Sequence, residues 1–277
     1  MLTAESEGGQ LKCHPYWAAQ DFGSLKLKSL SEKKVSLDPT KHRSPAERRS
    51  DAGRRRANTT IETSPPTPST NGELPYVIVR KFALSHAAHP FSPIREITQL
   101  HYSSWPDFGA PASPSQLLGL VELSNKTQRA ASSAASPGRS DDPEQDESVR
   151  PMLVHCSAGC GRTGTFCTVD SVIDMLKRQR KESKDGVVPM DTSFGGDYMS
   201  RGKQADSPAE DWIFDQDIDL VEKTVEDFRG QRLSMVQSLR QYVLCYETIL
   251  EWLSQQNSGV PSRANRDRSG SDAGHMG

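Results

Sequence analysis

The sequence predicts an α/β or α+β fold, because segments of alternating apolar residues and segments with helical periodicity both occur along the chain. A second observation is that apolar residues are unevenly distributed. Four long polar stretches contain few of them, which leaves roughly 160 of the 277 residues to form a core. That number suffices for one domain and is too small for two.

Three segments combine alternation with β-forming residues and are expected to be strands: Leu25–Leu30, Tyr76–Leu84 and Ile94–Tyr102. A fourth, the short apolar segment Met152–Val154, leads directly into a glycine-rich loop.

Apolar residues at helical spacing predict four helices. Within the second and third, the stripes Phe166, Val169, Val172 and Leu176, and Ile218, Val221, Val225 and Phe228, are expected to pack in the core. The predicted helices cover Ser115–Ser124, Gly164–Arg178, Asp217–Phe228 and Leu233–Leu253.

The four polar stretches cannot bury enough surface to offset chain entropy, so we expect them to be disordered. They are inserts at 33–73, 126–150 and 183–211 and a tail at 256–277. The predicted organisation is therefore one domain over residues 1–255, followed by the tail.

Composition excludes several classes of function. A net charge of −2 gives no overall signal for nucleic-acid binding. The sequence has no apolar run of about 18 residues, and its first residues lack the features of a signal peptide. Five cysteines without disulfide-like spacing suit a reducing compartment. We expect a cytoplasmic protein without membrane or nucleic-acid partners.

The loop 155-HCSAGCGRTG-164 admits three special interpretations besides an ordinary strand–turn–helix joint. A zinc site needs further paired cysteines or histidines, which the sequence lacks. A redox pair favours two residues between its cysteines, whereas Cys156 and Cys160 have three. The ordinary strand–turn–helix joint explains poorly the small residues followed by an arginine, a hydroxyl residue and a helix.

An anion-binding loop with a nucleophile explains every part of this stretch. Backbone N–H groups at a helix N-terminus form an anion cradle, which Gly159, Gly161 and Gly164 allow to curl tightly. The planar fork of Arg162 can hold two phosphate oxygens. The same positive field stabilises a thiolate at Cys156, which could attack phosphorus in line.

A thiolate–phosphate intermediate also needs an acid and a base. The stretch 104-SWPDFGAP-111 follows a predicted strand and places Asp107 in a turn framed by Pro106 and Gly109. With Trp105 as a packed hinge, it is typical of a mobile flap that carries an acid. Alone it could equally be an ordinary Pro-Asp turn.

Together these motifs resemble the tyrosine-specific protein phosphatases. The resemblance rests on HCSAGCGRTG, on the Trp-Pro-Asp of residues 105–107, on 237-QSLRQY-242, and on 1-MLTAESEGGQLKCHPYW-17. The polar inserts and the C-terminal sequence are similar to those of the fungal branch of this family. The resemblance implies a twisted mixed sheet flanked by helices, cysteine-based hydrolysis of phosphotyrosine, and no metal or organic cofactor.

The resemblance also implies a role for each matching residue. Cys156 is the nucleophile, Asp107 the acid and then the base, and Arg162 the phosphate-binding arginine. His155 tunes the cysteine, Thr163 helps the sulfur to leave, and Gln237 positions water. Supporting residues are Trp105, Gln241, Glu7 and Lys12, and the phosphate-binding loop comprises Ser157, Ala158, Gly159, Cys160, Gly161 and Arg162. Cys160 is expected to line the loop, and the other cysteines to have no catalytic role.

The match begins partway into the family's domain. Strings of the form KNRY and NYINAS, which supply the aromatic wall of the phosphotyrosine pocket, occur nowhere in these residues. Met1 is expected to fall inside a central strand. Either the sequence is a fragment or has a mispredicted start, or it is a short form with weak or no catalysis.

The sequence leaves three alternative functions for this chain. The first is a monomeric protein tyrosine phosphatase that acts in signalling on phosphotyrosine proteins, with signalling kinases as plausible substrates. The second is an inactive, phosphate-binding regulatory remnant, and the third is a dual-specificity phosphatase with a shallow pocket.

The inserts contain four Ser-Pro or Thr-Pro sites for proline-directed kinases, at Ser44, Ser64, Thr67 and Ser207, and the alternative is a plain polar linker. Arg54–Arg56 gives only a weak signal for nuclear import.

Overall fold

The computed structural model describes residues 1–18, 21–37, 75–131, 143, 151–185, 211–215 and 217–258. Within them it has six strands, four α-helices and a short 3₁₀ helix, which confirms the α+β class. The elements are β1 (Ser6–Glu7), β2 (Gln10–Leu11), β3 (Asp21–Phe22), β4 (Leu25–Ser36), β5 (Tyr76–His86), β6 (Arg95–His101), α3 (Pro114–Ala131), α4 (Gly161–Asp185), η2 (Asp211–Phe214), α5 (Leu220–Gln231) and α6 (Leu239–Ser258). The predicted phosphorylation sites and most of each insert lie outside these residues.

The main sheet has the strand order β3-β4-β5-β6, and β1 and β2 form a separate hairpin. Every pairing among the described strands is antiparallel, so the expected mixed sheet is not observed there. The difference comes from residues 152–154, which do not join the sheet as a strand.

Residues 1–3 lie between β6 and the glycine-rich loop but are not a regular strand. Backbone hydrogen bonds join Met1 to Leu100 and Tyr102 on one side, and Leu2 N to His155 O on the other. Too few bonds form on each side for a ladder, so the expectation of a central strand at Met1 is wrong in this form. The contacts nevertheless tie the loop to the sheet.

The first insert begins later than predicted, because β4 continues to Ser36. Lys33 and Lys34 pair with Val79 and Ile78 in an unbroken antiparallel register. Strand pairing uses backbone groups, so exposed lysines at a sheet edge are compatible with it.

The helices also extend into segments that we expected to be disordered. α3 reaches Ala131, α4 reaches Asp185 and α6 reaches Ser258, while η2 begins at Asp211. Polar side chains satisfy local groups in these last turns: Thr127 Oγ1 donates to Leu123 O, and Ser183 Oγ donates to Gln179 O. An exposed helix end needs no apolar face when it continues a helix that is already packed.

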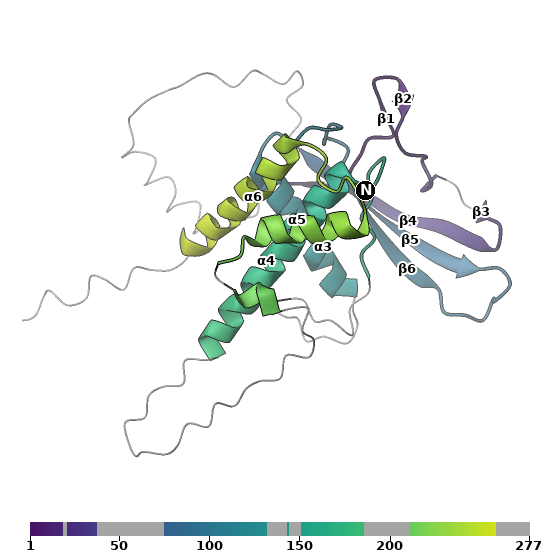
Figure 1. Ribbon diagram of the computed structural model, residues 1–277. Coiled ribbons are helices and arrows are strands. Elements are labelled where there is room, and N and C mark those ends of the chain that lie inside the picture. Colours follow the sequence, from purple (N-terminus) through teal and green to yellow (C-terminus); the bar gives the residue numbers. More distant parts are fainter. Residues whose placement is uncertain are drawn as a thin grey trace, which may run out of the picture.

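The core lies where the helices meet the inner end of the sheet. α4 contributes Val169 and Val172, α6 contributes Leu244, and β5 contributes Val77, all buried. Figure 1 shows the helices gathered on one side, with β4, β5 and β6 extending away from them. No described helix is long and apolar enough to cross a membrane.

The helix predicted from Leu233 begins only at Leu239, and residues 232–238 form a loop in front of it. Ser234 and Val236 have φ values of 66° and 57° there. This conformation is costly for a β-branched residue and persists only where its surroundings hold it. Arg229 supplies that support, donating from Nε to Met235 O and from Nη2 to Val236 O.

Candidate active site

The loop 155–160 carries Cys156 into the N-terminus of α4. This helix begins at Gly161, earlier than the predicted Gly164, so the positive end of its dipole lies within the loop. Gly159 has a φ of 69°, a conformation that glycine adopts without strain, and its N–H points to the sulfur of Cys156 at 3.2 Å. The loop therefore curls around the thiol as the sequence predicted.

Cys156 differs from the other cysteines in its electrostatic surroundings. Burial alone would raise its pKa, but hydrogen bonds from the Thr163 hydroxyl and from the N–H groups of Thr163, Cys160 and Gly159 lower the pKa below the ordinary thiol value. The Thr163 hydroxyl acts on the thiol by its proximity, because its buried Oγ1 makes no hydrogen bond of ordinary geometry with any described residue. Burial instead raises the pKa of Cys167 to about 11 and that of Cys245 to about 12.

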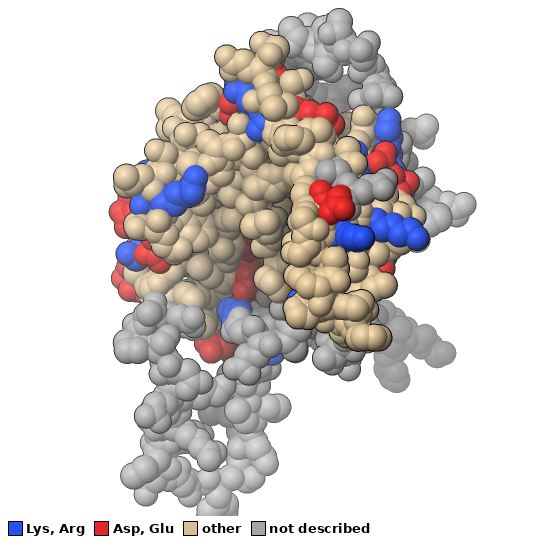
Figure 2. Space-filling view, turned by 90° about the vertical axis from the view of Figure 1, so that its right-hand side faces the viewer, with Lys and Arg blue, Asp and Glu red and all other residues tan. Residues whose placement is uncertain are grey.

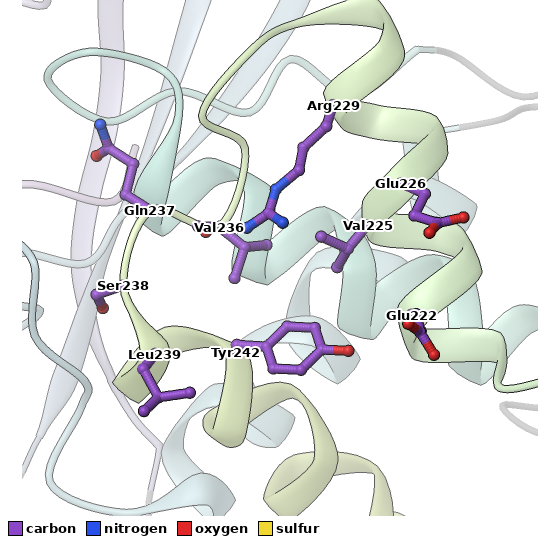
Figure 3. A pocket seen from close by; sticks show the side chains of 9 residues that line it. All are labelled: Glu222, Val225, Glu226, Arg229, Val236, Gln237, Ser238, Leu239 and Tyr242. Carbon is purple, nitrogen blue, oxygen red and sulfur yellow. Dashed lines mark hydrogen bonds between the residues drawn. The ribbon is translucent and has the colours of Figure 1, made fainter.

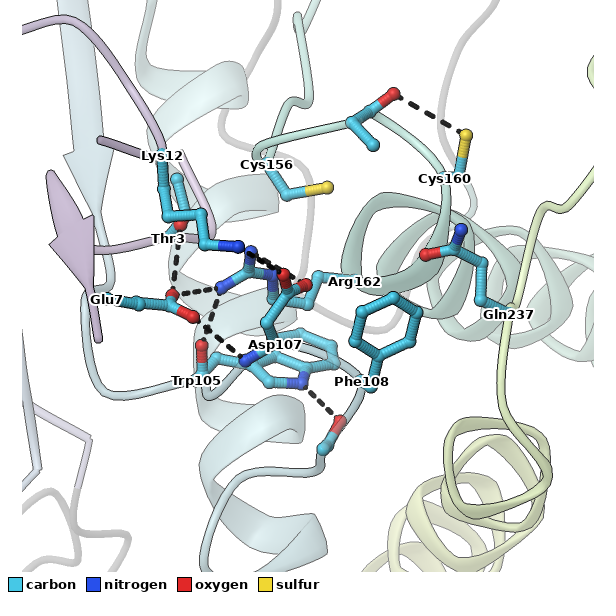
Figure 4. A network of polar contacts seen from close by, with 12 residues as sticks. Thr3, Glu7, Lys12, Trp105, Asp107, Phe108, Cys156, Cys160, Arg162 and Gln237 are labelled. Carbon is cyan, nitrogen blue, oxygen red and sulfur yellow. Dashed lines mark hydrogen bonds and ion pairs between the residues drawn. The ribbon is translucent and has the colours of Figure 1, made fainter. Parts of the chain in front are cut away.

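Arg162 lies at the centre of the polar network in Figure 4. Its side chain is 1% exposed, and Nη1 donates to Glu7 Oε1 at 2.6 Å and to Trp105 O at 2.9 Å. Its Nε is buried and has no hydrogen-bond partner among the described residues. A buried donor without a partner is costly, so this atom is a ready site for an anion oxygen.

Asp107 faces the loop from the flap, as Figure 4 shows. One carboxylate oxygen accepts from Arg162 Nη2 at 3.1 Å and the other from Lys12 Nζ at 3.0 Å. The N–H of Asp107 donates to Glu7 Oε2 at 3.2 Å. Glu7 and Lys12 belong to the β1–β2 hairpin and the residue after it, so this hairpin holds both the flap and the arginine, as predicted.

The flap is anchored at its hinge. Trp105 is fully buried, and its Nε1 donates to Gly109 O at 2.9 Å across the turn. Phe108 has a φ of 54°, and its carbonyl accepts from Ser238 Oγ at 3.0 Å. The hydroxyl of Ser238 therefore joins the flap to the loop before α6, a contact that the sequence did not predict.

Gln237 and Gln241 approach the loop from the opposite side. The Oε1 of Gln241 accepts from the backbone N–H groups of Gln237 and Ser238, which fixes the loop in front of α6. A methyl group placed on Gly161 would lie 2.9 Å from Gln237 Oε1, so the glutamine side chain reaches the start of α4. The structure therefore places both glutamines beside the start of α4.

Behind Gln237 lies a pocket of about 290 Å³ between α5 and α6, drawn in Figure 3. Val225, Val236 and Tyr242 line its interior, and Glu222 and Glu226 project from α5. Gln237 and Ser238 line it too, so it borders the loop before α6.

Two contacts to the loop were missed from the sequence. Arg232 donates from Nη2 to Ala158 O at 2.8 Å and from Nε to Cys160 Sγ at 3.3 Å, so Cys160 lines the loop under an arginine. Tyr16 OH lies 2.9 Å from His155 Nε2. Tyr16 lies within the N-terminal motif already quoted, which could have indicated it. Arg232 carries no comparable signal.

On the face shown in Figure 2, basic and acidic side chains of the described residues are interspersed. Across the described part of the chain, no group of three His, Cys, Asp or Glu could hold a metal ion.

Comparisons with known proteins identify the family of this chain. The family model for protein-tyrosine phosphatase matches residues 1–191. Tyrosine-protein phosphatase 3 of Saccharomyces cerevisiae is 27% identical over 71% of this chain, and human receptor-type tyrosine-protein phosphatase alpha is 31% identical over 62%. The matched parts span only 18% and 15% of those relatives.

A solved structure of PTPN18 in complex with HER2-pY1248 phosphopeptides covers 91% of this chain and 61% of its own, at 23% identity and a TM-score of 0.49.

Proposed function

Because this chain belongs to the protein-tyrosine phosphatase family, we propose that it hydrolyses phosphotyrosine in proteins through a cysteinyl-phosphate intermediate. One observation carries the proposal. The Cys156 thiol has a lowered pKa at the N-terminus of α4, and Arg162 in the first turn of that helix has a buried Nε with no hydrogen-bond partner among the described residues. A thiolate and an anion-binding arginine at one helix N-terminus are what phosphate-monoester cleavage requires.

In the first step, loop N–H groups and Arg162 bind the phosphate oxygens, and the Cys156 thiolate attacks phosphorus. The phosphorus–sulfur bond forms as the bond from phosphorus to the phenolic oxygen breaks. Asp107, reaching in from the flap, gives its proton to that oxygen, so tyrosine leaves as the neutral phenol.

In the second step, water replaces the phenol. Gln237 positions the water, the Asp107 carboxylate takes one of its protons, and the water oxygen attacks phosphorus as the phosphorus–sulfur bond breaks. The sulfur leaves as a thiolate, which the hydroxyl of Thr163 and the loop N–H groups stabilise. Inorganic phosphate leaves, and Asp107 is again protonated for the next cycle.

The proposed substrates are phosphotyrosine proteins, with signalling kinases among them, and the proposed role is in cellular signalling. Family membership and the chemistry of the loop support this. An inactive, phosphate-binding protein would keep the anion contacts of Arg162 but would not form the covalent intermediate, which makes the two functions separable by experiment.

The test is turnover of an aryl phosphate and of a phosphotyrosine peptide, with rapid quenching to trap phosphate on the protein. We expect Cys156→Ser to abolish turnover and trapping, and Asp107→Ala to lower kcat by about 10²–10⁴-fold. Cys13→Ser, a change of the same kind at a cysteine outside the site, should leave both intact. Full activity of Cys156→Ser would refute the mechanism, and phosphate binding without turnover by the unmodified chain would favour the inactive alternative.

A further inference from the structure

A chain of hydrogen bonds runs from β4 through β5 and β6 to the residue before the nucleophile. Glu32 Oε2 accepts from Arg80 Nε at 2.6 Å, and Arg80 Nη1 donates to Gln99 Oε1 at 3.0 Å. Gln99 Nε2 donates to Tyr16 OH at 2.9 Å, and Tyr16 OH lies 2.9 Å from His155 Nε2. The steps of the proposed mechanism use none of these groups.

The direction of each bond in this chain is determined by chemistry. An arginine can only donate, so the oxygen of the Gln99 amide must face Arg80 and its nitrogen must face Tyr16. The second N–H of that amide faces Met1 Sδ at 4.0 Å, which agrees with this orientation. The oxygen of Tyr16 therefore accepts from Gln99, and its own proton is left to donate.

The acceptor for that proton is His155 Nε2. Burial raises the pKa of Tyr16, so the phenol keeps its proton at neutral pH. Burial also lowers the pKa of His155, so the ring is neutral and carries one proton. With Nε2 accepting, that proton is on Nδ1, which lies 3.3 Å from Cys156 O.

We propose that Gln99 and Arg80 are positioning residues that hold His155 in its Nδ1–H tautomer through Tyr16. In the opposite tautomer, the Tyr16 proton would lose its acceptor and a bare Nδ1 would face the Cys156 carbonyl oxygen. Both changes are unfavourable, so the amide of Gln99 sets where the proton of His155 lies.

A second histidine supports the same assignment of donors. Arg80 Nη1 also lies 3.1 Å from His101 Nδ1, which must accept, so His101 carries its proton on Nε2 and donates to Thr3 O at 3.0 Å. Arg80 thus selects opposite tautomers in two histidines. It is 8% exposed and is held from behind by Glu32 and by the ring of Trp17, whose centroid lies 4.9 Å from the guanidinium carbon.

The tautomer of His155 affects the nucleophile through the peptide bond that follows Cys156. This link to the nucleophile rests on the proposed function. His155 Nδ1–H holds the carbonyl of Cys156. Because the peptide is planar and trans, the N–H of Ser157 then points away from the imidazole and is available to an anion. Loss of the Nδ1–H bond frees this peptide to rotate and weakens the cradle.

The test uses Gln99→Glu, which changes the amide nitrogen to oxygen and so reverses the direction of the hydrogen bonds between residue 99, Tyr16 and His155. A carboxylate can only accept, so Tyr16 would donate to it, and the oxygen of Tyr16 would instead accept a hydrogen bond from His155 Nε2–H. We expect the ¹⁵N spectrum of histidine-labelled protein, with His155 assigned by its loss in His155→Gln, to show Nδ1–H in the unmodified chain. In Gln99→Glu we expect a protonated Nε2. The pH profile for alkylation of Cys156 by iodoacetamide should shift upward by about one unit of thiol pKa, a tenfold change in the acidity of the thiol.

The matched control is Gln116→Glu. Gln116 Oε1 accepts from Tyr102 OH at 2.9 Å, away from His155, so the same change of atom should leave the tautomer of His155 and the alkylation profile unchanged. Tyr16→Phe removes the donor without adding charge and should release the Nδ1–H preference. A protonated Nε2 in the unmodified chain would overturn the proposal, as would Nδ1–H retained in folded Gln99→Glu. These spectra need no turnover, so they stand or fall separately from phosphatase activity.

Discussion

The contact between α4 and the loop 232–238 predicts that the same substitution has opposite effects in two helices. A methyl group on Gly164 would lie 2.6 Å from Val236 N and 3.2 Å from Met235 Cα. These are backbone atoms that cannot rotate away, and Val236 N also donates to Cys160 O. In α5, the same methyl group added at Gly230 would meet no atom within 4 Å apart from the backbone of its own helix and its chain neighbours.

The magnitude follows from two opposing contributions. Glycine to alanine in a helix stabilises by up to about 1 kcal/mol, and this gain is shared by both variants. Overpacking costs about 1–3 kcal/mol and applies only to Gly164→Ala. We therefore expect Gly230→Ala to be stabilised slightly, and Gly164→Ala to be less stable than it by about 1–3 kcal/mol.

Urea unfolding followed by circular dichroism measures this difference as a shift of the midpoint at constant slope. Since Val236 precedes Gln237, Gly164→Ala should also slow hydrolysis of the intermediate, by up to about 10²-fold if the glutamine moves by about 1 Å. Equal stability of the two variants would show that α4 and the loop are not in the contact described, and would refute the reasoning.

Two further predictions concern the flap and acid stability. Ser238→Ala and Ser238→Asp both remove the donor to Phe108 O, so each should lower kcat by about fivefold. Asp can still accept from Gln241 N at the start of α6, so only the Ala variant should also lose about 1 kcal/mol of stability. Equal stability of the two variants would contradict this. Burial lowers the pKa of His101 to about 4, so between pH 6.5 and 4 the unfolded chain binds more protons than the native state. As the pH falls over that range, the free energy of unfolding should fall by up to about 3 kcal/mol. Urea unfolding at several pH values measures this, and the same dependence on pH in His101→Gln would exclude His101 as the cause.

The sequence predicted most of the candidate site because its residues lie in short motifs. Trp105 and Asp107 are framed by Pro106 and Gly109, and Cys156 and Arg162 share one loop, so local spacing was sufficient. The resemblance added Glu7 and Lys12, whose long-range ion pairs no spacing could have indicated.

The errors have physical reasons. Leu233, Met235 and Val236 continue the helical pattern of α6, but Leu233 is 82% exposed and Val236 has a positive φ, because Arg229 holds the backbone in a loop. β4 was cut short because Lys33 and Lys34 are polar, although a ladder needs only their backbones. The extent of the domain and its disordered inserts remain predictions.

Gln99 and Arg80 were missed for a different reason. Each lies in a strand whose alternation explained it as an ordinary residue, and their relation to His155 appears only when three separate segments meet. Buried polar side chains of this kind carry no local signal, because their partners are distant in sequence.

The ion pair between Asp107 and Arg162 makes the flap a competitor of the anions that the loop binds. A tethered carboxylate at 3.1 Å from the guanidinium has an effective concentration of millimolar or above, and any free anion must displace it. Monoanions such as chloride, with one negative charge, gain little by the exchange, whereas a dianionic phosphate ester gains more. Under the proposed function, Asp107 therefore discriminates against common cellular anions before any chemistry begins, and its removal should tighten the binding of inorganic phosphate.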